Sequence, residues 1–180
     1  MLNESEHGFP TYLPEQEAVL IGWVADEESE VSGQPVYYIH WRGSAFIGQY
    51  EPEDDMFSPM FSPDVESRVM SDQVHAVRES KPNVELSSVG KALHNAWSLS
   101  STGIIGKKQA HVLALLNADF SRSDISTILN IEPSTVDSHR YDAEERTEAA
   151  EAFVSTISQL VNEDGPQVVE PEQEEHLPDA

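Results

Sequence analysis

Short runs of apolar residues in the first fifty positions are typical of β-strands. The runs at 18–25 (AVLIGWVA), 36–42 (VYYIHWR) and 45–50 (AFIGQY) are rich in β-branched and aromatic residues. Gly43 and Ser44 separate the last two runs, which is the length and chemistry of a tight hairpin. We therefore expect a small antiparallel β-meander. Aromatic residues alternate onto both of its faces, so one face should be covered by helices.

A helix is expected after the meander, beyond an acidic and proline-rich connector at 51–63 (EPEDDMFSPMFSP). The repeated Met-Phe-Ser-Pro in this connector is either a packing feature or a motif for a partner. Ser62 as the cap and Pro63 in the first turn predict a helix that continues to about Glu79 and ends before Lys81. Its inward positions are Val65, Val69 and Ala76.

A second helix is predicted by one apolar stripe, which ends in a linker at 98–103 (SLSSTG). The stripe consists of Leu86, Val89, Leu93, Ala96 and Trp97.

Three further helices with short joints are expected from residue 105 onward. The first, at 107–117, is followed by the aromatic anchor Phe120. Ser121 and Asp124 form the pattern of a capping box that opens the second helix. Asn130 tolerates the left-handed conformation that ends a helix, and Pro133 suits the first position of the next one. A three-residue turn between two helices is the pattern of a helix-turn-helix.

The helical pattern continues from the third helix to about residue 161. The apolar positions that repeat every seven residues are Val136, Ala143, Ala150 and Ile157. Val154 and Val161 occupy the adjoining apolar row, which Arg140 and Thr147 interrupt. A seven-residue repeat is typical of a seam between helices. Two partners fit this seam: a second copy of the chain, as a homodimer through helix 136–161, or the chain's own N-terminal domain.

The composition is strongly acidic. Of 180 residues, 33 are Asp or Glu and 10 are Lys or Arg, which gives a net charge of −23 at pH 7. The absence of cysteine excludes disulfides, cysteine-bound zinc and a thiol nucleophile. Residues 1–8 are acidic where a signal peptide needs basic residues, and no apolar run reaches the roughly 18 residues of a membrane span. We expect a soluble, cytoplasmic protein with no membrane contact.

The charge is unevenly distributed, because the segment 104–141 is neutral. Its acidic residues are Asp119, Asp124, Glu132 and Asp137, and its basic residues are Lys107, Lys108, Arg122 and Arg140. Either chance and burial explain this neutral window, or it is a surface that meets an anionic partner. The acidic excess elsewhere resembles that of halophilic archaeal proteins, which stay soluble in concentrated salt. The tail at 163–180 is acidic and proline-rich, with little to bury, and should be disordered.

Residues 105–140 (IGKKQAHVLALLNADFSRSDISTILNIEPSTVDSHR) resemble the helix-turn-helix of LuxR-type regulators and of region 4 of bacterial sigma factors. They are especially similar to short archaeal sigma-like helix-turn-helix proteins. The matching parts are the VLALL helix, the opening Asp124-Ile125, the turn Leu129-Asn130-Ile131, and Pro133-Ser134-Thr135-Val136 followed by His139. No family is recognised in residues 1–100.

The resemblance implies that the third helix is a recognition helix in the major groove of double-stranded DNA. The implied base-contacting residues are Ser134, Asp137, Ser138 and Tyr141. The implied phosphate-contacting residues are Lys107, Lys108, Ser121, Arg122, Thr135 and Arg140. LuxR-type proteins usually have a basic residue in place of Asp137, whose own base partner would be a cytosine amino group. Other roles remain open: Ser121 as a cap alone, Arg140 in a pair with Glu144, and His139 as a packing residue.

Enzymatic chemistry has no support in the sequence. The seven histidines never lie four apart, and HExxH, GxSxG and phosphate-loop patterns are absent. Carboxylates are too abundant for any pair of them to indicate acid–base catalysis. We therefore expect a protein that is not an enzyme, with no catalytic residue, metal or cofactor.

Four parts are expected: a flexible segment at 1–17, an α+β domain of unknown role at 18–100, a helix-turn-helix domain with an extended helix at 101–162, and the tail. The predicted function is that of a DNA-binding transcriptional regulator in a high-salt cytoplasm. The alternative is a protein–protein interaction module built on the same scaffold. A basic patch on one face would favour DNA, whereas burial of the third helix against the sheet would favour the alternative.

Overall fold

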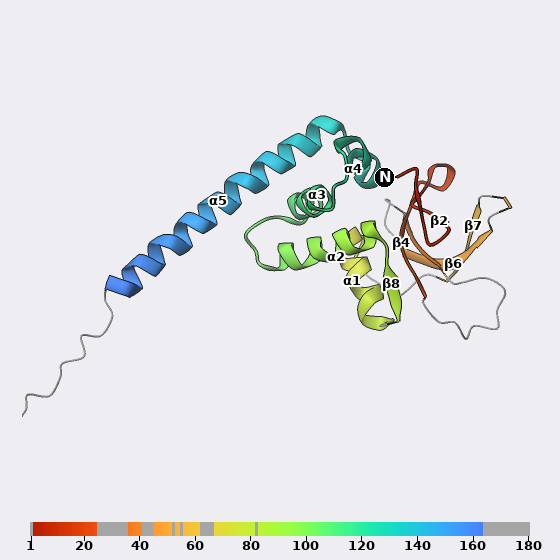
Figure 1. The fold of residues 1–180 in the computed structure, drawn as a ribbon, viewed down its shortest axis with the longest axis horizontal. Helices are drawn as coiled ribbons and strands as arrows, with labels where there is room; N and C mark the ends of the chain where they lie inside the picture. The colour runs from red at the N-terminus through yellow and green to blue at the C-terminus, as the bar shows by residue number, and fades with distance from the viewer. Residues whose placement is uncertain are drawn as a thin grey trace, which may run out of the picture. The chain divides into compact units, whose positions relative to one another are not determined.

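The computed structural model describes residues 2–24, 36–40, 45–51, 53–54, 56–61, 67–81 and 83–163, and its fold is α+β, as expected (Figure 1). Strands dominate the N-terminal part, and helices follow them. By its internal contacts the chain divides into two units, Met1–Thr147 and Glu148–Ala180. Several predicted features lie outside the described residues: the hairpin turn at 43–44, the helix start at 62–66 and the tail at 164–180.

The predicted meander is present as β4 (Ala18–Val24), β5 (Val36–His40) and β6 (Ala45–Glu51). The three strands are neighbours in one antiparallel sheet, in which Leu20 lies opposite Tyr38 and Tyr38 lies opposite Phe46. Every residue of β4 up to Trp23 is buried, so both faces of this strand are covered.

The connector predicted at 51–63 is wrong in its central part, which forms the strand β7 (Met56–Phe61) beside β6. Proline is tolerated there because β7 is the last strand in the order of the sheet. The side chain of Gln16 fixes the strand through two hydrogen bonds to the backbone of Phe57, of 2.8 and 3.0 Å. Phe57 packs with Leu20 and Trp23 on one face of the sheet, so this copy of the repeated Met-Phe-Ser-Pro serves packing.

Residues 1–17, predicted as a flexible segment, contain four short elements. β1 (Ser5–Glu6) pairs with β2 (Phe9–Pro10), β3 (Tyr12–Leu13) pairs with β4, and η1 (Pro14–Gln16) is a turn of 3-10 helix. The hydroxyl and the amide of Thr11 both donate to the carbonyl of Glu4. Leu2 joins the main core.

The first helix begins later than predicted, because residues 67–69 are not helical. α1 spans Met70–Ser80, and its start is stabilised by hydrogen bonds from the Ser67 hydroxyl to the Asp72 carboxylate (2.6 Å) and from the Gln73 side chain to the Ser67 carbonyl (2.9 Å). The buried stripe is therefore Met70, Val74 and Val77, whereas Val69 and Ala76 are only half-buried.

The second helix begins and ends later in the chain than predicted. Leu86 belongs to a short strand, β8 (Val84–Leu86), which pairs with β4. α2 spans Ser88–Ser101 and is capped by Ser87, whose hydroxyl accepts from Gly90 N and donates to the carbonyl of Leu20. Residues 98–101 are helical rather than a linker. Hydroxyl groups near this end satisfy the carbonyls of Trp97, Ser98 and Leu99.

The main core is continuous across residue 100, where the sequence analysis divided the chain. It begins on the sheet with Val19 and Ile21, passes through Leu93 of α2, and includes Leu115 and Ile125 of the helices beyond. A Cβ at position 90 would collide with the carbonyl of Ile21, so only glycine allows α2 to lie this close to β4. The helical segments between residues 105 and 136 therefore share one core with the N-terminal strands and helices.

Candidate nucleic-acid interface

The predicted helix-turn-helix elements are present as α3 (Lys107–Asn117), α4 (Arg122–Leu129) and the N-terminal end of α5 (Pro133–Glu163). Ser121 caps α4 in a capping box with Asp124. Asn130 adopts the left-handed conformation at φ 47° and ψ 55°, and Pro133 is the first residue of α5. The Ser126 hydroxyl donates to the carbonyl of Ile131 at 2.6 Å and closes the turn.

Buried side chains fix the geometry of this unit. Phe120, Ile125, Ile128 and Val136 are each at most 3% exposed and belong to one core with Leu115 of α3. Further along α5, Ala143 is fully buried against Ala110 and Ala114 of α3 and Ala96 of α2. Small residues allow these helices to approach closely, so the first three turns of α5 have a defined position on α2 and α3.

The predicted base-contacting residues share an exposed face on these same turns of α5. Ser134, Asp137, Ser138 and Tyr141 are all exposed, and Tyr141 retains 66% of its accessible surface. The Ser138 hydroxyl donates to the carbonyl of Ser134 at 3.1 Å. Among the described residues nothing covers this face, so it is not buried against the sheet.

Arg122 serves the turn rather than standing free for phosphate. Its Nε donates to the carbonyl of Pro133 at 3.0 Å, and its terminal nitrogen lies 2.6 Å from the Asp137 carboxylate. These contacts join the first turn of α4 to the start of α5. The guanidinium also offsets the negative charge of the Asp137 carboxylate.

The other residues predicted to contact phosphate differ in whether their side chains already form ion pairs or hydrogen bonds within the chain. Lys107 pairs with Asp72 at 2.7 Å, and Arg140 pairs with Glu144 at 3.2 Å. Lys108 is exposed and pairs with no carboxylate among the described residues. Ser121 is engaged in the cap of α4, and Thr135 is half-buried. His139 is half-buried with its Nδ1 enclosed, which fits a packing role.

A polar contact between α1 and α3 was not predicted. His111 Nε2 accepts a hydrogen bond of 3.3 Å from the backbone of Ser71, beside the Lys107–Asp72 ion pair. Burial lowers the pKa of His111 to about 4, so the ring is neutral at pH 7. Burial alone would raise the pKa of Asp72, but hydrogen bonds from Lys107 and Ser67 outweigh it and lower that pKa. The partners are about forty residues apart, and no local pattern indicates them.

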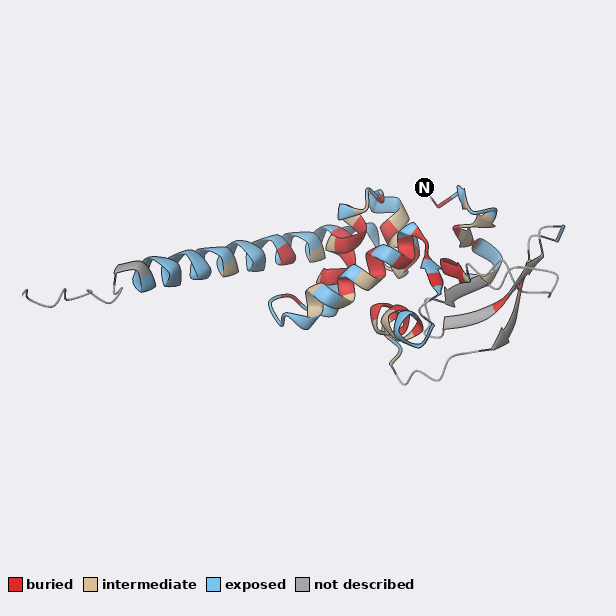
Figure 2. Cartoon of the chain, turned by 60° about the horizontal axis from the view of Figure 1, so that its bottom comes forward, coloured by how far each residue is buried: buried red, intermediate tan, exposed pale blue. Residues whose placement is uncertain are grey.

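The C-terminal half of α5 presents an uncovered apolar face. Its exposed large apolar residues are Phe153, Val154, Ile157, Leu160 and Val161, which retain between 43% and 67% of their accessible surface. Figure 2 draws this part of the helix almost entirely in the exposed colour. The segment 152–161 (AFVSTISQLV) contains no charged residue.

Comparison with known proteins gives no relative: no family model, curated protein or solved structure matches the chain. Within the described part of the chain, no cluster of three or more His, Cys, Asp or Glu residues could hold a metal ion. None of the helices described is both long and apolar enough to span a membrane.

Proposed function

We propose that the chain is a DNA-binding transcriptional regulator whose recognition surface is the exposed face of the first three turns of α5. The observation that carries the proposal is the division of this helix into two faces. Val136 and Ala143 are buried against the supporting helices, whereas Ser134, Asp137, Ser138 and Tyr141 are exposed together. A buried face that holds a helix rigidly while the opposite face stays uncovered is what docking into a major groove requires.

The ion pair between Arg122 and Asp137 makes an acidic residue in the recognition helix compatible with binding to DNA. A carboxylate shielded by a guanidinium at 2.6 Å repels phosphate less than a free one, and it can still accept a hydrogen bond from a cytosine amino group. Uncharged hydrogen-bond donors then bind most of the phosphates and orient the protein on DNA; they are hydroxyl groups and the backbone N–H groups in the first turn of α5. Lys108 is the best placed of the predicted cations to meet a phosphate directly.

High salt is part of the proposal because of the net charge of −23. In dilute buffer this charge opposes association with DNA, and a few local cations release few counterions. At about 1 M salt the Debye length falls to roughly 3 Å, so distant carboxylates lose their influence and local contacts decide. We therefore expect binding that survives molar potassium chloride, in a cytoplasm of that kind.

A homodimer through the C-terminal half of α5 completes the proposal. Ile157 and Leu160 belong to an exposed stripe that a single chain leaves in water, and two copies would cover it in the manner of a coiled coil. The charge-free segment 152–161 lets two copies of a very acidic chain meet without opposing like charges. A dimer would present two recognition helices, which suits a site with two half-sites.

The test of DNA binding is a polarisation assay with genomic fragments in molar potassium chloride. Wild-type protein should bind a subset of fragments, while Ser138→Glu and Tyr141→Ala should weaken binding about tenfold or more through lost contacts at the base edges. Ser98→Glu, an equal charge change at an exposed position of α2, is the matched control and should bind as wild type. Absence of binding at every salt concentration, or equal binding by all variants, would contradict the proposal.

The test of the dimer is sedimentation equilibrium in the same buffer. Wild type should sediment at twice the mass of the 20.0 kDa chain, and Ile157→Asp with Leu160→Asp should sediment as a monomer. Ser155→Asp, in the same segment but outside the apolar stripe, is the control for added charge. A monomeric wild type would contradict the dimer and leave the DNA proposal standing.

One observation favours a second function, that of a protein-interaction module. Three of the four basic residues near the helix-turn-helix already pair with carboxylates, so the basic patch expected of a DNA-binding protein is weak. Under this alternative the exposed face of α5 binds a protein, and Tyr141 anchors the contact. Loss of a co-purifying protein on Tyr141→Ala, with no DNA binding by wild type, would favour this second function.

A further inference from the structure

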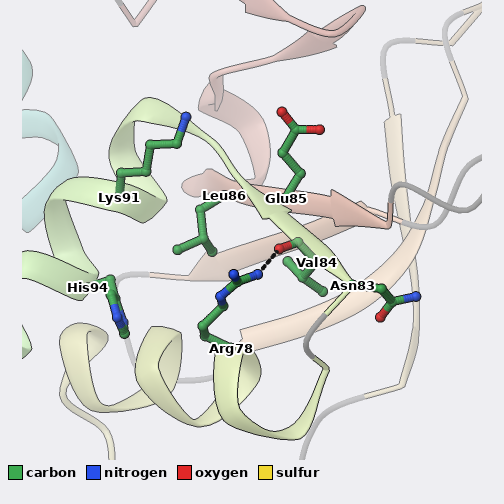
Figure 3. Close-up of a pocket in the computed structure, with 7 residues that line it drawn as sticks. All are labelled: Arg78, Asn83, Val84, Glu85, Leu86, Lys91 and His94. Atoms are coloured by element: carbon green, nitrogen blue, oxygen red, sulfur yellow. Dashed lines mark hydrogen bonds between the residues drawn. The ribbon is translucent and has the colours of Figure 1, made fainter.

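A cavity of about 540 Å³ between α1, β8 and α2 offers a ligand little free side-chain surface (Figure 3). Its apolar residues, Val84 and Leu86, are only 1% and 8% exposed. The guanidinium of Arg78 already donates to the carbonyl of Val84 at 2.6 Å. The apolar face on the C-terminal half of α5 is, by contrast, uncovered. The proposed homodimer uses this face, whose residues also indicate how two copies are oriented.

The exposed apolar residues of this face are arranged symmetrically about Ile157. Phe153 and Val154 lie four and three residues before it. Leu160 and Val161 lie three and four residues after it. Residues three and four apart are neighbours on one side of a helix, so the five side chains form one patch. This patch has the same pattern in either direction along α5, and the pattern alone therefore allows both parallel and antiparallel pairing.

The uncharged part of the helix is centred on the same residue. The segment 152–162 (AFVSTISQLVN) contains no charged residue, and acidic residues bound it at positions 151 and 163, each six residues from Ile157. An antiparallel pair with its two-fold axis at Ile157 would overlap the two uncharged segments along their full length. Within α5, acidic residues of the two copies would then come together at the two ends of the overlap, where position 151 of one copy lies near position 163 of the other.

The part of α5 directly before this segment is strongly acidic. Residues 142–151 (DAEERTEAAE) contain five acidic residues and one arginine. A parallel pair would place each of these stretches beside its counterpart in the second copy, and their like charges would repel. An antiparallel pair places the two stretches at opposite ends of the overlap. Salt weakens this preference, because the Debye length falls to roughly 3 Å at about 1 M.

Packing within each chain disfavours the parallel pair at any salt concentration. Ala143 lies two heptads before Ile157 on the same row of α5, and α2 and α3 of its own chain cover it. In a parallel pair the two copies of Ala143 would approach each other at one end of the seam, each with its own covering helices, which would compete for the same space. In an antiparallel pair the two covered rows lie at opposite ends of the seam.

We infer that two copies of the chain pair antiparallel through the C-terminal half of α5, with the two-fold axis at Ile157. This inference rests on the proposed homodimer and adds its orientation and register. Rotation about the axis places Phe153 beside Leu160 of the second copy, and Val154 beside Val161 of the second copy, because each pair lies at nearly the same level and on the same side of the seam. The two copies of Ile157 meet at the centre.

The experiment is disulfide formation between single-cysteine variants, for which the chain is suited because it contains no cysteine. Full-length Val154→Cys, isotopically labelled, and unlabelled Val161→Cys are mixed in molar potassium chloride, allowed to exchange subunits, and oxidised with glutathione disulfide. Mass spectrometry then separates the mixed disulfide dimers from those of one variant.

The antiparallel pair predicts that the mixed disulfide predominates. Identical positions would lie about 9 to 12 Å apart along the helix axis, beyond the limit of roughly 7 Å between the Cα atoms of a disulfide. Position 154 of one copy would lie beside position 161 of the other. We therefore expect the mixed disulfide to exceed either of the others at least about tenfold.

Two further mixtures control the result. Phe153→Cys with Leu160→Cys repeats the test at the second predicted pair, so the result does not depend on one substitution. Ser155→Cys changes an exposed residue on the opposite side of the helix from Ile157. Mixed with Val161→Cys, it should form few disulfides.

Sedimentation equilibrium of the wild type and of each reduced variant separates the two ways in which the account can fail. A dimer whose disulfides join identical positions, or form in random proportions, would overturn the antiparallel arrangement and leave the proposed homodimer standing. A dimer that forms no disulfide at either predicted pair would overturn the register. A monomeric wild type would contradict the homodimer, and this inference with it.

Discussion

The two halves of α5 use the same seven-residue repeat in opposite ways. Val136 and Ala143 are 2% and 0% exposed, and each packs against helices of its own chain. Ile157 and Val161, further along the same helix, are 43% and 67% exposed. Of the two arrangements that the sequence left open for the seam, packing onto the chain itself is present in the first half, whereas the second half is exposed.

A heptad pattern therefore marks an apolar face of a helix but does not specify what covers that face. In the first half, charged residues such as Asp137 and Arg140 alternate with the buried ones, and the exposed face is polar. In the second half, the segment 152–161 is free of charge on every side. A helix that is apolar at one face and uncharged at the others is poorly suited to remain single in water.

The largest expected difference between the two halves of α5 is in the free energy of unfolding when an apolar residue of each half is replaced by Asp. Val136→Asp places an unpaired charge in the core and should cost about 3 to 5 kcal/mol. Ile157→Asp places it at an exposed position and should change the stability of the monomer by less than about 0.5 kcal/mol. Urea unfolding of both variants, measured at a concentration where the wild type is monomeric, checks this. Equal losses would contradict the assignment of the two faces.

Lowering the pH should reduce the free energy of unfolding of the unit that contains His111, because this buried side chain is neutral in the folded protein. Its pKa in the folded protein is about 4, below the ordinary value of 6.5, so the unfolded chain takes up the proton first as the pH falls. The stability present above pH 6.5 is then lost between pH 6.5 and about 4, by roughly 3 kcal/mol at most. His111→Gln has no such titration and should lose less stability over this window. Parallel pH profiles of unfolding for the two proteins would contradict this role.

A smaller effect is expected at the joint between α4 and α5. Both side chains of the Arg122–Asp137 pair are more than half exposed, so Arg122→Gln should cost only about 1 kcal/mol of stability. Its effect on DNA binding should be clearer, because Asp137 is left unshielded. Adding Asp137→Asn in that background should recover binding. Arg146→Gln removes the same charge from an exposed position of α5 outside the predicted contact residues and is the control; an equal effect on DNA binding would mean that general charge, not shielding of Asp137, is responsible.

The three helices of the helix-turn-helix could be predicted from the sequence because their signals are local. The cap at Ser121 and Asp124, the left-handed Asn130 and the first-turn Pro133 each act within a few residues, and each was found where it was expected. Because the interacting residues are close together in the sequence, such patterns can be recognised without knowledge of the fold.

The features that were missed depend on distant parts of the chain. β7 is ordered by Gln16, which lies 41 residues before Phe57. β8 exists because β4 offers it an edge to pair with, and the His111–Ser71 contact spans 40 residues. The resemblance implied a phosphate contact for Arg122, and its pairing with Asp137 was not predicted because that pairing depends on how two helices are placed, which no local pattern specifies.

Hydrogen–deuterium exchange of the full chain, with and without a bound DNA fragment in molar potassium chloride, distinguishes the proposed recognition helix from the rest of α5. DNA should slow exchange in the first turns of α5, at 133–141, while exchange at 150–161 stays the same in both states. Protection confined to 150–161, or no protection in α5 when DNA is bound, would contradict the assignment of α5 as the recognition helix.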